Sequence, residues 1–148
     1  MLAAARTCTA VQGRVYDGRR TALSPDDEAL PCINLRMGDT DARLEIGAGV
    51  CTHVSQVNFE IFLRADDVPG TVETQAMQPS LRDLADPIRL ELHRILFAAF
   101  PFTSDVTGLR QGGTSRPEAG DEDAIYQETC SYSVQFETQE ADLSLSPR

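Results

Sequence analysis

Several absences narrow the classes of protein to which this chain can belong. None of its 148 residues is a lysine, and all 13 basic residues are arginines; we attribute this to genomic bias toward arginine codons rather than to function. No run of about 18 or more apolar residues exists, the length that a transmembrane helix needs. The N-terminal stretch Met1 to Arg6 is too short and too weakly apolar for a signal sequence. We therefore expect no membrane association and a chain that stays in the cytosol where it is made.

Cysteine chemistry is also sparse. The four cysteines lie far apart in the sequence and form no CxxC pair: Cys8, Cys32, Cys51 and Cys130. This spacing predicts small buried thiols rather than disulfides or a metal site. A chain of this length can bury roughly 70% of the surface that its unfolded form exposes, so it needs neither a metal nor a disulfide to hold a core. We predict one domain over residues 1–148, with 139–148 as a C-terminal tail.

The charge of the chain is negative and unevenly distributed. The net charge is −10, and residues 117–148 hold eight carboxylates against Arg148 alone, whereas residues 1–116 hold fifteen carboxylates against twelve arginines. A surface of this sign repels phosphate. The sequence therefore disfavours a conventional nucleic-acid-binding domain.

Two segments alternate between apolar and polar residues, at 57–64 and 130–137. Side chains repeat every two residues along a strand, so each segment has one apolar face. These faces comprise Val57, Phe59, Ile61 and Leu63 in the first segment, and Cys130, Tyr132, Val134 and Phe136 in the second. Strands of this kind form a sheet that helices cover on one face only, which predicts an α+β fold.

Further strands are expected upstream of these two. Residues 12–18 form a short extended piece that ends at an Asp-Gly turn. After Pro31 comes a strand over 32–37, with Ile33, Leu35 and Met37 inward, which the sequence 38–41 ends. A Gly-Ala-Gly turn then leads into a long strand from about 52 to 65. The prediction is a mostly antiparallel sheet of about four strands, with a projecting hairpin over 38–53.

The helical part of the chain follows residue 80. Ser80 and Asp83 resemble a capping box, and an apolar stripe has helical spacing: Leu81, Leu84, Ile88, Leu92, Ile95, Leu96 and Ala99. Proline inside a helix costs roughly 3 kcal/mol, and Asp86 is a good N-cap for a helix that starts at Pro87. We therefore predict a short helix that ends near Ala85 and a second over 87–100.

Two further segments complete the predicted organisation. Residues 1–7 are rich in alanine and could be the last turns of a helix. Residues 103–123 contain four glycines and Pro117, which predicts a long loop.

Residues that could perform chemistry are few. His53 and His93 lie in no triad-like pattern, and two lone histidines do not make a metal site. The acidic runs 26–28 and 121–123 lack the glycine and the alternating oxygen ligands of a calcium loop, so we interpret them as solvated surface. Gly112-Gly113 lacks the following lysine and helix of a phosphate-binding loop. We therefore predict no catalytic, cofactor-binding or metal-binding residues, and a protein that is not an enzyme.

The order of segments nevertheless resembles a known family. The stretches that carry the likeness are 15–20, 30–35, 57–63 followed by the break Asp66-Asp67-Val68-Pro69 and a helix, and 129–138. In this order they resemble the tail terminator family of long-tailed bacteriophages, the lambda-type minor tail protein U, over roughly residues 12–138. Family members usually open with a full amphipathic helix, whereas this chain has a curtailed one within residues 1–11. Pro87 and the acidic tail also depart from the family pattern.

The resemblance implies a structural virion protein. Such a subunit forms a hexameric ring that caps the tail tube, ends tail polymerisation and offers the surface for head-tail joining. Its partners would be the tail tube protein and the head completion protein, and genomic DNA would pass through the ring without sequence-specific binding. Six copies, each with a net charge of −10, would form a wall that repels the phosphate backbone.

Two other interpretations remain open at the level of sequence. One is a different neck component, such as a head completion protein, which shares the small size and the acidity. The other is a small cytosolic α+β enzyme or ligand-binding domain, against which stands the lack of a concentrated polar constellation.

Overall fold

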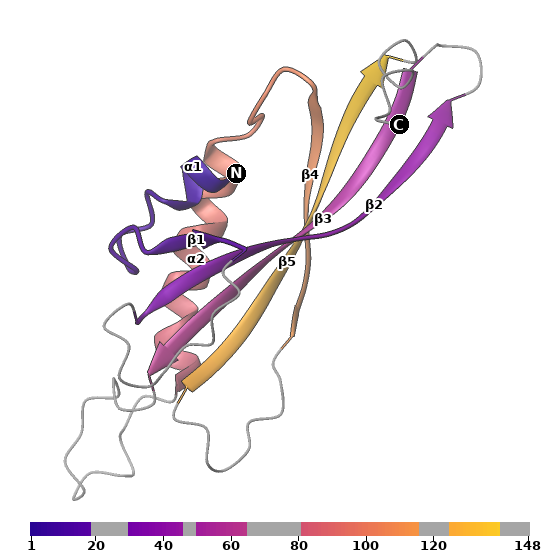
Figure 1. Cartoon of the computed structure of the whole chain (residues 1–148). Helices are drawn as coiled ribbons and strands as arrows, with labels where there is room; N and C mark the ends of the chain where they lie inside the picture. Colours follow the sequence, from indigo (N-terminus) through magenta and orange to yellow (C-terminus); the bar gives the residue numbers. More distant parts are fainter. Residues whose placement is uncertain (19–29, 46–49, 65–80, 116–124, 140–148) are drawn as a thin grey trace, which may run out of the picture.

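The computed structural model describes residues 1–18, 30–45, 50–64, 81–115 and 125–139. Both acidic runs and the predicted tail beyond 139 lie outside these ranges. The described elements follow the order α1 (Leu2–Ala5), β1 (Val15–Asp17), β2 (Cys32–Glu45), β3 (Val50–Arg64), α2 (Leu81–Ala98), β4 (Val106–Ser115) and β5 (Ile125–Gln139) (Figure 1). This confirms the α+β class. No helix in the described ranges has the length and apolar character needed to cross a bilayer.

The strands form one mixed sheet in the order β1-β2-β3-β5-β4. β1 pairs with β2 in parallel, and the other three pairings are antiparallel. The sheet is therefore mixed and has five strands, whereas about four mostly antiparallel strands were predicted. The added strand is β4, which occupies part of the predicted loop 103–123. Its glycines and small polar residues obscure the alternation by which a strand is recognised.

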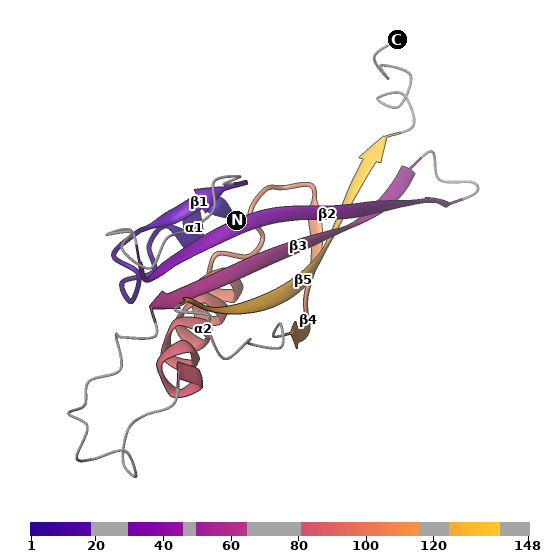
Figure 2. The same cartoon turned by 60° about the horizontal axis from the view of Figure 1, so that its bottom comes forward.

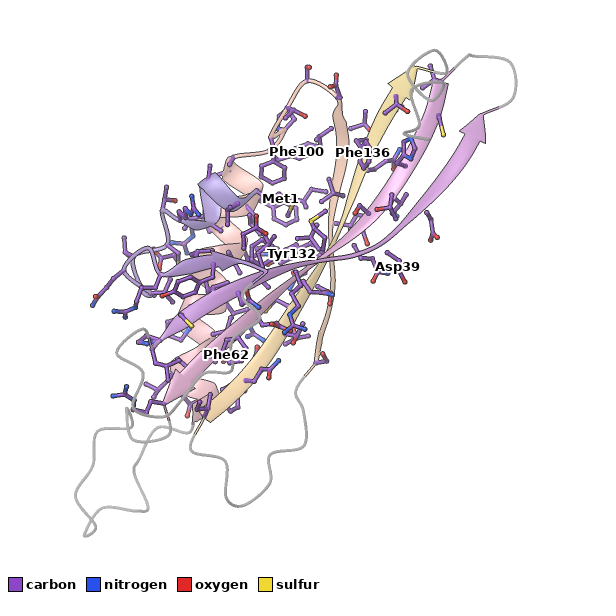
Figure 3. The ribbon with its side chains drawn as sticks, viewed as in Figure 1. Met1, Asp39, Phe62, Phe100, Tyr132 and Phe136 are labelled. Atoms are coloured by element: carbon purple, nitrogen blue, oxygen red, sulfur yellow. The ribbon has the colours of Figure 1, made fainter. Side chains whose placement is uncertain are left out.

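The predicted apolar faces of the two long strands are confirmed. Val57, Phe59, Ile61 and Leu63 are buried, and their partners on β5 include the buried Cys130 and Tyr132. The rings of Phe59 and Tyr132 meet edge to face, with centroids 5.7 Å apart. Figure 3 shows Tyr132 at the centre of the sheet, on the side where the helices pack. Met37 departs from the prediction, because its side chain is 63% exposed although Ile33 and Leu35 are buried.

α2 is one continuous helix, and the predicted break at Pro87 is wrong. Ala85, Ile88, Leu92 and Leu96 form a buried stripe along the helix and join the core cluster. Burying a large aliphatic side chain stabilises by roughly 1.5–3 kcal/mol, so this stripe outweighs the roughly 3 kcal/mol cost of an internal proline. Pro87 itself is exposed, and its ring therefore displaces no core packing.

The N-terminal segment packs into the same core. α1 is a helix of four residues, as the curtailed pattern predicted, and Ala5, Cys8 and Val11 are fully buried. β1 ends at an Asp-Gly turn, where Gly18 has a φ of +63° and its N–H donates to the carbonyl of Leu35 at 2.8 Å. All four cysteines are buried free thiols, which confirms the prediction for them.

β2 does not end at residues 38–41 as predicted but continues to Glu45. A β-bulge places Gly38 and Asp39 opposite Gln56, and a Cβ added at Gly38 would lie 3.0 Å from that of Gln56. Beyond the bulge, residues 40–45, 50–55 and 134–139 form a three-stranded arm, and residues 106–109 of β4 add a fourth strand at its base, along 134–136. Figures 1 and 2 show the arm extending past both helices. The β2–β3 pairing confirms the strands of the predicted hairpin, whose turn lies outside the described residues.

Candidate functional site

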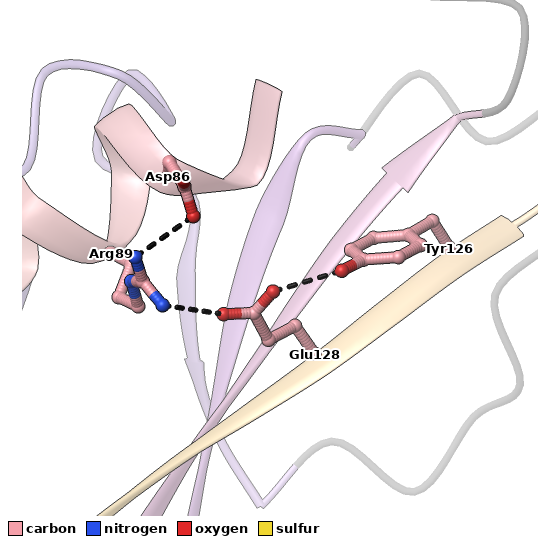
Figure 4. A network of polar contacts seen from close by, with 4 residues as sticks. All are labelled: Asp86, Arg89, Tyr126 and Glu128. Carbon is pink, nitrogen blue, oxygen red and sulfur yellow. Dashed lines mark hydrogen bonds and ion pairs between the residues drawn. The ribbon is translucent and has the colours of Figure 1, made fainter. Parts of the chain in front are cut away.

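A polar network crosses the apolar interface between α2 and the sheet (Figure 4). Glu128 of β5 is fully buried on the core face, opposite Ile61. Its carboxylate accepts a 2.9 Å hydrogen bond from the hydroxyl of Tyr126 and lies 3.7 Å from the guanidinium of Arg89. Arg89 also pairs with Asp86, one turn earlier on α2, at 2.9 Å. The network thus joins the helix to the last strand through charged groups.

This network has the properties of a structural tether rather than of a reaction centre. Glu128 has no exposed surface from which to reach a substrate. Removing Arg89 would take a positive charge away from this buried carboxylate, and weaker compensation of a buried charge is destabilising. Among the described residues, no group of three or more histidine, cysteine or carboxylate side chains could hold a metal ion.

A second polar junction holds the N-terminal segment against α2. The Glu91 carboxylate accepts hydrogen bonds from the hydroxyl and backbone N–H of Thr9, at 2.7 and 2.9 Å, and from the N–H of Ala10 at 2.9 Å. These bonds, those from Thr9 foremost, lower the pKa of Glu91 to about 2. Burial, helped by the neighbouring carboxylate, raises the pKa of the Cys8 thiol to about 11. Cys8 is therefore a protonated thiol at neutral pH, unsuited to act as a nucleophile.

A mainly apolar hollow lies between α1 and the base of the arm. Its volume is about 320 Å³, and its lining comes from Met1, Leu2, Met37, Val134 and Phe136 among others. Polar groups on this lining are few, whereas a catalytic pocket combines an apolar wall with several convergent polar groups. The hollow is thus better suited to contact with an apolar side chain than to chemistry.

The face of the sheet opposite the helices is polar and internally hydrogen-bonded. Glu60 is only 8% exposed there, although it belongs to the alternate, polar set of β3. One of its oxygens accepts from the side-chain amide of Asn34 at 2.9 Å and pairs with Arg36 at 3.0 Å. On the neighbouring row, the hydroxyl of Ser131 donates to the side-chain oxygen of Asn58 at 2.8 Å.

The structure places the two histidines on different elements. His53 lies in the arm, where its ring stacks on Phe136 at 4.9 Å and its Nε2 is 2.9 Å from the hydroxyl of Thr138. His93 lies on α2, in ring contact with Phe97 at 4.4 Å. Each histidine packs against aromatic neighbours.

The other sequence-based candidates do not form a site. Gly112-Gly113 belongs to β4 rather than to a loop, at a bulge opposite Ser131. A Cβ at Gly112 would lie 3.0 Å from the carbonyl oxygen of Ser131, which explains the need for glycine there. The acidic runs 26–28 and 121–123 lie outside the described residues.

Two features of the described structure were not predicted from the sequence. One is the continuation of β2 through residues 38–45, because the strand signal there is broken by Gly38 and by acidic residues. The other is the pair of junctions at Glu128 and Glu91, since contacts between distant segments leave no local pattern. No protein-family model matches the sequence, and no curated protein matches it.

Proposed function

We propose that this chain is a structural virion protein, the tail terminator of a long-tailed bacteriophage. In this proposal six copies form a ring at the head-proximal end of the tail, assembled in the host cytoplasm. The ring caps the tail tube, ends its polymerisation and presents the surface for head-tail joining. Its partners are the tail tube protein and the head completion protein, and genomic DNA passes through it.

The observation that supports this proposal best is the three-stranded arm. The paired rows from Ser55 to Val50 of β3 continue beyond the helix layer, with β2 on one side and β5 on the other. A subunit that assembles needs area for contact with its neighbours, and the arm supplies it. The buried carboxylates Glu128 and Glu91 join elements of the fold to one another, a role that supports an assembling subunit better than a catalytic one.

Deletion of the gene tests the proposal directly. We expect the mutant lysate to contain tail tubes of uncontrolled length that are not joined to filled heads, because nothing caps the tube or offers the neck surface. Electron micrographs measure both the length and the attachment. Supplying the gene in trans should restore tails of normal length.

The alternatives give different micrographs. Tails of normal length that fail to attach would indicate another neck or head completion protein. Normal tails attached to heads would contradict any role in the neck and return the small enzyme or ligand-binding domain to consideration.

A further inference from the structure

The sheet has two outer edges without a described strand partner. β1 pairs with β2 only at residues 33–35, so the outer edge of β2 is open from Arg36 to Glu45 within the described chain. On the other side β4 pairs with β5 alone, which leaves its outer edge open along its whole length. A row of unpaired backbone N–H and C=O groups is a template for another strand.

The two open edges differ in charge. β2 presents exposed Asp39 and Asp41, and Figure 3 shows Asp39 pointing away from the sheet. Arg36 begins this edge but is already paired with Glu60. Arg110, also exposed, is the only charged residue of β4. Opposite charges on adjacent strands stabilise a strand pair, so β4 with Arg110 is a favourable partner for the part of the β2 edge that carries Asp39 and Asp41.

The complementary charges also lie at matching levels of the sheet. One row of paired residues runs from Asp41 through Val54 and Gln135 to Gly108, and Arg110 is two positions beyond Gly108. Asp41 and Arg110 border the same hollow of about 410 Å³. Residues two positions apart on adjacent strands are within reach of a long side chain. A second copy that continues this row would therefore bring its Arg110 to Asp41.

Strand direction is consistent with such a continuation. From β2 through β3 and β5 to β4 every step is antiparallel. The β4 strand of a neighbouring copy, placed beside β2 in the same orientation, would again be antiparallel to it. β1 covers the outer edge of β2 only at residues 33–35.

We infer that copies of this chain join edge to edge, with residues 38–42 of β2 in one copy pairing antiparallel with 107–111 of β4 in the next. Two different edges meet, so the contact is head-to-tail, and such contacts generate rings when the rotation closes. The inference deepens the proposed function and rests on it, because it names the surfaces through which the ring subunits bind.

Charge reversal at the two edges tests the contact. Asp41→Arg and Arg110→Asp each place like charges at every interface, and each should weaken ring association about tenfold at low ionic strength, where exposed charges act most strongly. The double variant D41R/R110D should recover rings. An equimolar mixture of the two single variants should also recover them, because in an alternating ring of six every interface then joins opposite charges. Sedimentation velocity and native mass spectrometry measure the assemblies.

Arg94→Asp is the matched control for Arg110→Asp, because it makes the same charge change at an exposed position of α2. It should leave the assembly unchanged. Rings that persist in both single variants would overturn the edge contact but leave the proposed ring function standing. The same conclusion would follow if the single variants lost ring formation and neither the mixture nor the double variant restored it. A wild-type protein that stays monomeric at every concentration, with tail tubes present, would overturn the proposed function and this inference together.

Discussion

Glu91 is a single side chain that joins two distant segments of this protein by hydrogen bonds. It joins α2 to residues 8–10, a segment 81 to 83 positions away in the sequence. Three of the bonds it accepts come from N–H or hydroxyl donors at 2.7–2.9 Å, and hydrogen bonds to a charged group are stronger than neutral ones. One carboxylate thus adds three hydrogen bonds to the core contacts of Ala5, Cys8 and Val11 that hold the N-terminal segment.

Replacing this carboxylate should make the stability of the protein less sensitive to acid. The hydrogen bonds hold the pKa of Glu91 at about 2, below its ordinary value of 4.5, so its contribution is complete above pH 4.5 and is lost as the pH falls toward 2. We expect Glu91→Gln to lower the free energy of unfolding by about 1–2 kcal/mol at pH 7, after allowance for the partial exposure of the site. Urea unfolding at pH 7 and pH 3 measures the difference, which should shrink at pH 3.

Glu137→Gln provides the control, because Glu137 is an exposed carboxylate on β5. Its unfolding free energy should match that of the wild type at both pH values. A difference between Glu91→Gln and wild type that is the same at pH 3 as at pH 7 would contradict the charged role of Glu91.

At the scale of elements, tertiary contacts determine where α2 and β2 end, even where a local residue favours an earlier end. α2 continues through Pro87 because its apolar stripe is continuous on both sides of that residue. β2 continues through Gly38 and Asp39 because a bulge absorbs the extra residue and keeps the pairing with β3 intact beyond it. After the bulge Thr40 faces Ser55, and their hydroxyls are 3.0 Å apart. The bulge shifts the register of β2 by one residue, and this shift separates the apolar half of the strand from the arm.

Adjacent positions of β3 should respond very differently to an added carboxylate. Phe59→Asp places a charge in the fully buried core, at a cost of several kcal/mol against a typical total stability of roughly 5–15 kcal/mol. Val134→Asp should have the same effect, and we expect neither variant to fold as a soluble protein. Asn58→Asp should be tolerated, because the hydroxyl of Ser131 can still donate to the side-chain oxygen at position 58.

Soluble yield and circular dichroism of the three variants measure this difference. If Asn58→Asp unfolds the chain as severely as Phe59→Asp, the two faces of β3 do not differ as their burial indicates.

At the scale of the whole molecule, net charge and shape support the same proposal. Each copy carries −10, and the arm and the open edges give it surfaces on which to meet other copies. A ring of such subunits around a DNA path would repel the phosphate backbone and so let DNA move without being held.

Isolated protein should therefore show no detectable affinity for duplex DNA, even at about 0.01 M salt, where the Debye length is roughly 30 Å. Filter binding or fluorescence anisotropy across a salt series measures this. Tight binding with a steep salt dependence would contradict a passive conduit.

Replacing Asp121, Glu122 and Asp123 by lysine reverses three charges in the acidic C-terminal region. Phage with this variant should eject DNA more slowly while tail length stays normal. Ejection at the normal rate would place this segment away from the DNA path.

The sequence by itself determined the α+β class, the apolar faces of β3 and β5, the buried thiols and the helical character of 81–98. These follow from the periodicity and composition of neighbouring residues, which a linear pattern records. Only the tertiary structure decided that α2 is unbroken, that β4 is a strand, that Met37 is exposed, and that Glu128 and Glu91 anchor distant segments. In each case the deciding free energy comes from contacts between residues far apart in the sequence, so local preference at Pro87, Gly38 or Gly112 could not reveal it.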